Sequence, residues 1–264
     1  MNVNLAGKVA LTTASSKGIG FAVAKVFLDA GASVAICARD KGGLEQARET
    51  LSATDSDRVF AMPGDLGDPT FPEALVDGVY KRFGQPIDIL VNNSGGPPPG
   101  DILSKSDAEW LAAINNNFLS VVRMCRLVVP SMKEKKWGRI INLTSTAARE
   151  PGAGMVLSNA TRAAVAAYAK TLAHEIGPFG ITVNTILTGG VLTDRLDSLL
   201  RKKIEGSDQT LAEVITEIEK TIPIRHIATP DEFAQTVLFL ASPEAGYLTG
   251  AAIPLDGGAS KSIF

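Results

Sequence analysis

The sequence is poor in the side chains that build disulfide frameworks and metal sites, with two cysteines and two histidines in 264 residues. Cys37 and Cys125 lie far apart, each in an apolar stretch, which is typical of buried free thiols. We therefore expect no metal site and a reducing compartment, the cytoplasm. His174 and His226 fall outside the loops that follow the predicted strands, so we expect neither to be catalytic.

Long apolar runs and clustered charge are also missing. No uncharged apolar segment approaches the roughly eighteen residues of a membrane-spanning helix, and residues 1–7 lack the apolar core of a signal peptide. The net charge is −2, the sequence pI is about 5.8, and the positive residues are scattered. A nucleic-acid surface would need them clustered. We expect a soluble protein with neither a membrane nor nucleic acid among its partners.

What the chain contains is a regular alternation of short β-branched apolar runs with longer segments of helical period. This order predicts an α/β fold: one doubly wound, Rossmann-like domain over residues 1–264, with about seven parallel strands and helices on both faces of the sheet. The predicted strands are 8–13, 33–38, 58–62, 87–92, 138–144, 181–187 and 251–255. The predicted helices are 18–30, 41–53, 71–84, 107–133, 155–178, 194–220 and 230–241.

Ligands of such sheets bind at the carboxyl ends of the strands, so the loops after the strands should surround one crevice. The first of these loops is a glycine-rich turn that leads into an amphipathic helix. Its glycines would let the backbone approach a pyrophosphate, whose charge is favoured by the free N–H groups at the helix start. A turn with no ligand explains the same sequence. The ligand-binding interpretation uses Thr13, Ser15, Ser16, Lys17, Gly18, Ile19 and Gly20.

The second predicted strand ends in Ala38-Arg39, where sites for NAD usually carry an acidic residue that binds the ribose 2′-hydroxyl. A cation there suits a 2′-phosphate, and Lys17 is expected near the same group. NADP(H) is therefore favoured over NAD(H), although Arg39 also fits a solvated loop charge. Later loops add cofactor-binding candidates that equally fit Asx-type turns, namely Asp65, Leu66, Asn92, Ser94 and Gly95.

Further motifs follow in a fixed order along the chain: Thr13-(x)₄-Gly18-x-Gly20, Asp65, Asn92-Asn93-Ser94-Gly95, Asn117, Ser145, Ile181-Thr182-Val183-Asn184 and the ending Tyr247 to Gly258. Together they make the whole chain resemble the short-chain dehydrogenase/reductase family, in the branch that includes 3-oxoacyl-acyl-carrier-protein reductases. The resemblance implies an oxidoreductase that uses NADP(H) on a small-molecule carbonyl or alcohol. It also implies a homodimer or homotetramer, catalytic roles for Ser145 and Asn117, and cofactor contacts from Gly189, Val191 and Thr193.

The resemblance fails at the active-site helix. The family has a Tyr-x-x-x-Lys pair thirteen residues after its catalytic serine, and this chain has Ser158 and Arg162 there. In the family mechanism the tyrosine protonates the carbonyl oxygen and the lysine holds the ribose. An aliphatic hydroxyl is a far weaker acid than a phenol of pKa about 10, and arginine does not release its proton. Tyr168 lies about three helical turns beyond Ser158 and is too distant to replace the phenol.

Two functions remain open at this point. In the first, a reductase with an atypical proton donor, Ser158 and Arg162 join the catalytic set. Either a water held by Ser158, Asn117 and Ser145 delivers the proton, or the substrate carries its own acidic group. Arg162 then holds the ribose and stabilises the developing alkoxide, or binds a substrate carboxylate. In the second, the chain is a nucleotide-binding scaffold without turnover. Ser145 would then only end a strand, and Asn117 would only bond within a kinked helix.

Two further segments carry expectations. Ala14 stands where the family has glycine, a change that a turn without positive φ tolerates. Residues 193–222 show apolar positions at helical spacing, at the place where the family has a mobile substrate lid. Plain packing explains the same spacing.

Overall fold

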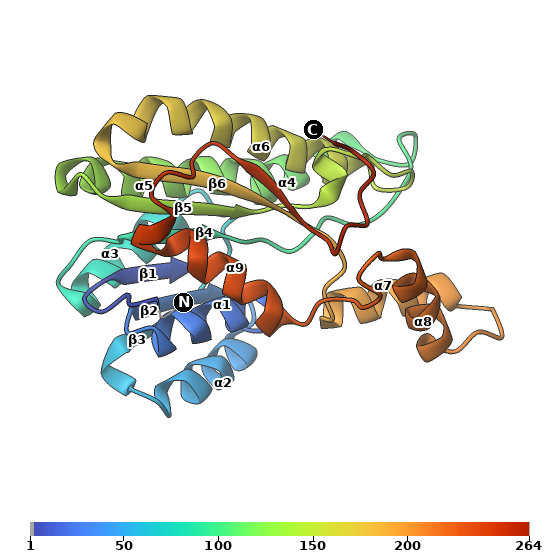
Figure 1. Cartoon of the computed structure of the whole chain (residues 1–264), viewed down its shortest axis with the longest axis horizontal. Helices are drawn as coiled ribbons and strands as arrows, with labels where there is room; N and C mark the ends of the chain where they lie inside the picture. The colour runs from blue at the N-terminus through green and yellow to red at the C-terminus, as the bar shows by residue number, and fades with distance from the viewer. Residues whose placement is uncertain (1–2, 264) are drawn as a thin grey trace.

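The computed structural model describes residues 3–263 and contains the predicted parallel sheet (Figure 1). Seven strands lie in the order β3-β2-β1-β4-β5-β6-β7, and every neighbouring pair is parallel. The order reverses between β1 and β4, which is the switch point where ligands bind in such sheets. Each predicted strand is confirmed to within two residues at either end. The strands are β1 Val9–Thr12, β2 Ser33–Ala38, β3 Val59–Pro63, β4 Ile89–Asn92, β5 Gly138–Leu143, β6 Ile181–Thr188 and β7 Ala252–Leu255.

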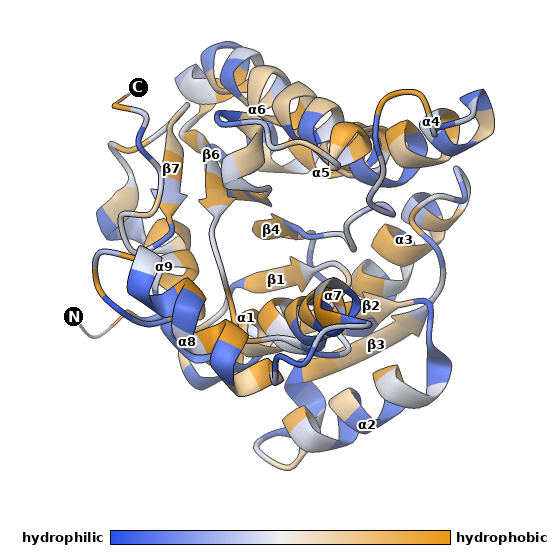
Figure 2. Cartoon of the chain, turned by 90° about the vertical axis from the view of Figure 1, so that its right-hand side faces the viewer, coloured by the Kyte–Doolittle hydropathy of each residue, from blue (hydrophilic) through white to orange (hydrophobic). Residues whose placement is uncertain are grey.

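Helices cover both faces of the sheet, so the predicted three-layer α/β fold is confirmed (Figure 2). One apolar core joins the sheet to α1, α2 and α9, and the other joins it to α3, α5 and α6. No helix among residues 3–263 is both long and apolar enough to cross a membrane. The helices are α1 Gly18–Asp29, α2 Lys41–Ser52, α3 Phe71–Phe83, α4 Asp107–Ile114, α5 Ser120–Lys135, α6 Val156–Ile176, α7 Asp194–Ile204, α8 Leu211–Thr221 and α9 Pro230–Ala241.

The strands are mostly apolar and buried because both faces of the sheet are covered. Alternate residues of a strand point to opposite faces, so Ala10 and Ile36 enter the first core while Leu11 and Cys37 enter the second. Cys37 and Cys125 are both buried free thiols, as predicted. Burial raises the pKa of each thiol to about 12.

The predicted helix 107–133 is wrong in one respect, because a π-helical turn, Asn115–Leu119, divides it into α4 and α5. Such a turn contains an extra residue and often marks a functional site. Here it presents three successive asparagines toward the loops of the sheet. The Asn115 amide donates to the carbonyl oxygen of Gly67, and Asn117 is buried against the loop after β4.

The predicted helix 194–220 is also wrong, since two helices occupy this segment. Gly206, with φ +81°, follows the end of α7. A capping box between Thr210 and Glu213 then starts α8. The apolar period continues across this break, so periodicity alone predicted one helix, whereas the left-handed glycine and the cap decide where the helices stop and start.

Candidate active site

The carboxyl ends of the strands open into a cleft of about 1280 Å³. The loops after β1 to β6 and several residues of α7 line it. Figure 2 shows α7 in front of the strands of the sheet. Most of the residues predicted for the cofactor and the reaction come together on its wall. These are Ser16, Lys17, Gly18, Ile19, Arg39, Asp65, Leu66, Ser94, Gly95, Asn117, Ser145, Ser158, Arg162, Gly189, Val191 and Thr193.

Four predicted residues, Thr13, Ser15, Gly20 and Asn92, lie behind that wall. The Thr13 hydroxyl donates to the carbonyl oxygen of Asn93 at 2.6 Å and thereby fastens β1 to the loop after β4. The Ser15 side chain is fully buried, and its hydroxyl donates to Thr12 and accepts the N–H of Cys37. These hydroxyls fix the position of the loops, and neither is directed at a ligand.

Gly20 and Asn92 act in a similar way. A Cβ atom on Gly20 would lie 2.6 Å from the carbonyl oxygen of Ala14, so only glycine lets α1 approach the turn this closely. The Asn92 amide donates to Asn142 Oδ1 at 2.9 Å and joins the ends of β4 and β5. Both residues therefore support the walls of the cleft.

Ala14 contradicts the expectation for its turn, because it adopts φ +47°. This is the left-handed region, in which a Cβ atom costs about 1–2 kcal/mol. The strained conformation turns the Ala14 carbonyl toward Asn93, whose side-chain amide donates to it at 3.0 Å. Ala14 therefore adopts the left-handed backbone conformation that glycine favours, although the residue is an alanine.

One end of the cleft is suited to a phosphate. Arg39 lines it at the end of β2, while the neighbouring Asp40 carboxylate accepts the N–H groups of Gly42 and Gly43 and caps α2. A carboxylate at a helix N-cap is stabilised by the free N–H groups there, so the negative charge of Asp40 does not require Arg39 as a partner. Arg39 is therefore available to an anionic ligand.

Lys17 reaches across the cleft to the first residue of α7. Its Nζ lies 2.7 Å from Asp194 Oδ2, and both side chains are largely exposed. The hydrogen bond from Lys17 holds the pKa of Asp194 below its usual range. Next to this pair, Gly18 has φ +59°, and a Cβ atom there would touch Thr193 at 3.3 Å. The glycine-rich turn and the start of α7 are therefore in direct contact.

The two serines lie at the other end. Ser145 follows the end of β5 by two residues, and its Oγ accepts the N–H of Ala147 at 3.2 Å, which leaves its hydroxyl proton free to be donated. Ser158 is buried in the first turn of α6 and lines the cleft. Within residues 3–263 its hydroxyl has no hydrogen-bond partner. Both hydroxyls are available to a ligand.

Arg162, one helical turn after Ser158, spans two strand ends. Its Nη1 donates to the carbonyl oxygen of Leu143 at 2.9 Å and its Nη2 to that of Ser94 at 3.2 Å. The guanidinium is buried, and desolvation, with a smaller contribution from the charge of Arg195, lowers its pKa to about 10. Arg162 therefore stays protonated at neutral pH, and its side chain is held rigidly.

Asn117 and Arg195 hold the same loop from two other sides. The Asn117 amide donates to Ser94 Oγ at 2.9 Å and to the carbonyl oxygen of Gly95 at 2.8 Å. Arg195, on α7, donates to the carbonyl oxygen of Pro97 at 3.1 Å. Arg195 was not among the predicted site residues, although its position two residues after Thr193 places it at the cleft.

The comparisons with known proteins agree with this geometry. A family model described as Enoyl-(Acyl carrier protein) reductase matches residues 13–260. The 3-oxoacyl-[acyl-carrier-protein] reductase FabG of Vibrio harveyi is 34% identical over 256 residues, which cover 97% of this chain and 98% of the relative. The chain belongs to the short-chain dehydrogenase/reductase family.

Solved structures of this family are closely similar. The L-sorbose reductase of Gluconobacter frateurii, complexed with NADPH and L-sorbose, superimposes with a TM-score of 0.94 at 32% identity and full coverage of both chains. An NADPH-bound short-chain oxidoreductase from Pseudomonas aeruginosa PAO1, described as containing an atypical catalytic center, gives a TM-score of 0.89 at 31% identity. The match covers 98% of this chain and 99% of that one.

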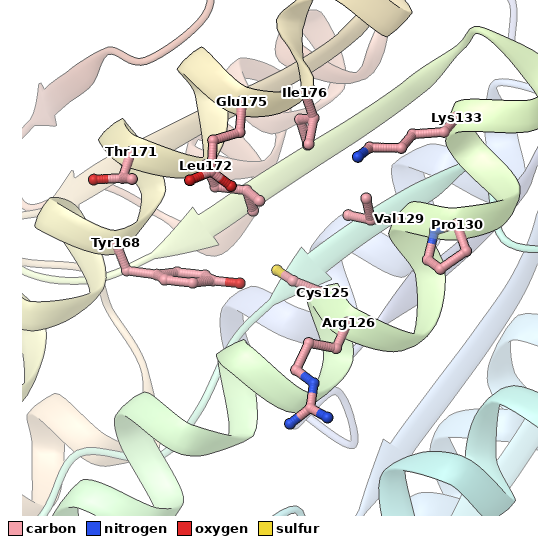
Figure 3. A pocket seen from close by; sticks show the side chains of 10 residues that line it. All are labelled: Cys125, Arg126, Val129, Pro130, Lys133, Tyr168, Thr171, Leu172, Glu175 and Ile176. Carbon is pink, nitrogen blue, oxygen red and sulfur yellow. The ribbon is translucent and has the colours of Figure 1, made fainter.

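No tyrosine is among the residues that line the cleft. All three tyrosines fall within the described part of the chain. Tyr80 and Tyr247 are exposed elsewhere on the surface. Tyr168 lines a separate pocket of about 300 Å³ between α5 and α6, where it points toward Cys125 (Figure 3). Burial raises the pKa of Tyr168, so the phenol is also a poor acid where it stands.

The segment predicted as a lid contributes apolar side chains to the cleft. Leu196 and Leu199 of α7 line it, whereas Leu200 is buried on another side of the helix and Val214 is buried on α8. Figure 1 shows α7 and α8 standing outside the three layers, beyond the end of the sheet. This arrangement combines packing with cover of the cleft.

Proposed function

We propose that the protein is an NADP(H)-dependent oxidoreductase that reduces a carbonyl group, or oxidises the corresponding alcohol, on a small or acyl-type substrate. One observation carries the proposal: a single cleft contains the glycine-rich turn and Arg39 at one end and Ser145 with Ser158 at the other. The similarity to reductases bound to NADPH supports the choice of cofactor.

The side chains present fit such a cofactor. Arg39 has no carboxylate partner among the described residues and would bind the 2′-phosphate, and Gly18 lets the start of α1 approach the pyrophosphate. Arg162 has further N–H groups beyond the two that it donates to carbonyl oxygens, and these would reach ribose hydroxyls. When bound, the nicotinamide supplies a hydride for the carbonyl carbon.

The chain's own residues then handle the carbonyl oxygen. Ser145 donates a hydrogen bond to it, and the fixed charge of Arg162 stabilises the negative charge that develops there. Ser158 is too weak an acid to be the source of the proton, so it positions a water that relays a proton from bulk solvent to the oxygen. A positioned general acid contributes about 10²–10⁴ in rate, and we infer slow turnover rather than none.

A spectroscopic assay tests this function. NADPH should bind more tightly than NADH, and a panel of ketones, 3-oxoacyl thioesters and sugars should contain a compound that oxidises NADPH. The Ser145→Ala variant should lose that oxidation while it still binds NADPH. Equal affinity for NADPH and NADH would contradict the cofactor assignment.

The missing phenol favours a second candidate, a nucleotide-binding scaffold that keeps the fold without turnover. It predicts NADPH binding with no oxidation by any member of the panel. For either function we propose a homodimer or homotetramer in the cytoplasm, with α5 and α6 at one subunit interface. A monomer by light scattering at micromolar concentration would contradict the oligomer.

A further inference from the structure

Two arginines from different elements lie along one short segment of the cleft wall. Arg162 of α6 donates to the carbonyl oxygen of Ser94, and Arg195 of α7 donates to that of Pro97, three residues later. Between them, Gly96 has no side chain, and a Cβ atom there would come within 3.2 Å of Arg195 Nη2. The guanidinium of Arg195 is therefore set against the backbone of this segment.

Neither guanidinium has a carboxylate partner within residues 3–263. The acids that line the cleft are engaged elsewhere: Asp40 caps α2, Asp65 accepts the N–H of Gly67, Glu109 pairs with Lys105, and Asp194 pairs with Lys17. Two positive charges thus share one wall without compensation. Each partner carbonyl carries only a partial charge, so much of the electrostatic cost of bringing the two cations together remains.

The two charged residues at the start of α7 contact opposite walls. Asp194 contacts Lys17 on the glycine-rich turn, which is the proposed phosphate side. Arg195 contacts Pro97 in the loop after β4, next to the segment that Asn117 and Arg162 hold. The unpaired charge of Arg195 is therefore on the side of Ser145 and Ser158, where a substrate would react.

We propose that the substrate is a carbonyl compound that carries an anionic group, a carboxylate or a phosphate ester, and that Arg195, assisted by Arg162, binds this group. The proposal rests on the reductase function and specifies its substrate class. A guanidinium binds a carboxylate or phosphate through two parallel hydrogen bonds, which also orients the molecule. Reduction takes one hydride from NADPH and one proton from water, and the anionic group itself is unchanged.

Matched ligand pairs test the proposal on the NADPH-bound protein. Calorimetry should compare 2-oxobutanoate with methyl 2-oxobutanoate, and dihydroxyacetone phosphate with dihydroxyacetone. At least one anion should bind ten times more tightly than its neutral partner. The Arg195→Gln variant should bind that anion at least ten times more weakly, while its affinity for the neutral compound should change less than twofold. Its affinity for NADPH should stay the same. Which pair shows the effect distinguishes a carboxylate from a phosphate.

Arg201→Gln is the matched control, because Arg201 is on the same helix but pairs with Asp197 and lies outside the cleft. It should change neither ligand nor cofactor binding. The proposal is overturned if the neutral compounds bind as tightly as the anions, or if Arg195→Gln lowers the affinity for NADPH instead of the affinity for the anions. The second result would make Arg195 a ligand of the cofactor phosphates.

Failure of the reductase function would look different. Anion binding that depends on Arg195, with no oxidation of NADPH, would support the anion site and contradict the proposed reaction. Oxidation of NADPH by neutral carbonyl compounds alone would support the reaction and contradict the anion site.

Discussion

The guanidinium of Arg162 donates to the carbonyl oxygen of Leu143, the last residue of β5, at 2.9 Å. Ser145 follows two residues later, so this bond fixes Arg162 relative to the serine expected to hold the carbonyl. A lysine at this position would have a single ammonium for the same contacts, whereas the guanidinium has five N–H donors. Arg162 thus connects the ends of two strands and is one of several positive charges that line the cleft.

Restoring the family's pair tests whether proton donation limits the reaction. The double substitution Ser158→Tyr with Arg162→Lys should raise kcat about 10²–10⁴-fold with any substrate found, because a positioned phenol then donates the proton. Ser158→Ala with Arg162→Lys is the control, since it changes the cation without adding the acid. Equal rates for the two double variants would show that the phenol is not the missing element.

The Arg39→Ala variant should bind NADPH about 10–100-fold more weakly, since a hydrogen bond to a charged group contributes about 1.5–3 kcal/mol. NADH, which lacks the 2′-phosphate, should bind almost as before. Quenching of protein fluorescence by the two cofactors measures both affinities. Arg48→Ala is the matched control, because Arg48 is on α2 and pairs with Glu45 at the surface. A loss of NADPH affinity in that variant would point to general charge effects.

The left-handed conformation of Ala14 should lower the stability of the protein. Ala14→Gly should raise the free energy of unfolding by about 0.5–1 kcal/mol, because relief of the left-handed strain exceeds the added entropy of the unfolded chain. Urea unfolding measures the change. Ala24→Gly, in the interior of α1, should lower the stability by about 1 kcal/mol or more. If both substitutions destabilise equally, the φ of +47° at Ala14 does not carry strain.

The two thiols should be inert in the folded protein. Burial raises the pKa of Cys37 and Cys125 to about 12, so at pH 8 the thiolate fraction is on the order of 10⁻⁴. Iodoacetamide should label neither thiol at pH 8 within an hour and both thiols in 8 M urea. Rapid labelling of one cysteine without denaturant would show that its helix or strand opens locally.

Sheet and helices followed from the sequence because their signals are local. Runs such as Val34-Ala35-Ile36-Cys37 are apolar on both faces, and each strand is followed by a turn and a helix of period 3.6. The helix breaks at Asn115 and Gly206 were not predicted from the sequence, because the apolar spacing continues across both of them. What divides those helices is a contact with another loop in one case and a left-handed residue in the other.

The sequence by itself determined the fold, the identity of the candidate residues, and the absence of a tyrosine thirteen residues after Ser145. These depend on residue type and spacing along one chain. Only the tertiary structure showed that the Asp40 carboxylate caps α2. It also showed that Arg162 donates to the carbonyl oxygens of Leu143 and Ser94, and that Arg195 donates to the nearby carbonyl oxygen of Pro97. Charge compensation depends on which groups meet in space, and Pro97 and Arg195, which are far apart in the sequence, are brought together only by the folding of the chain.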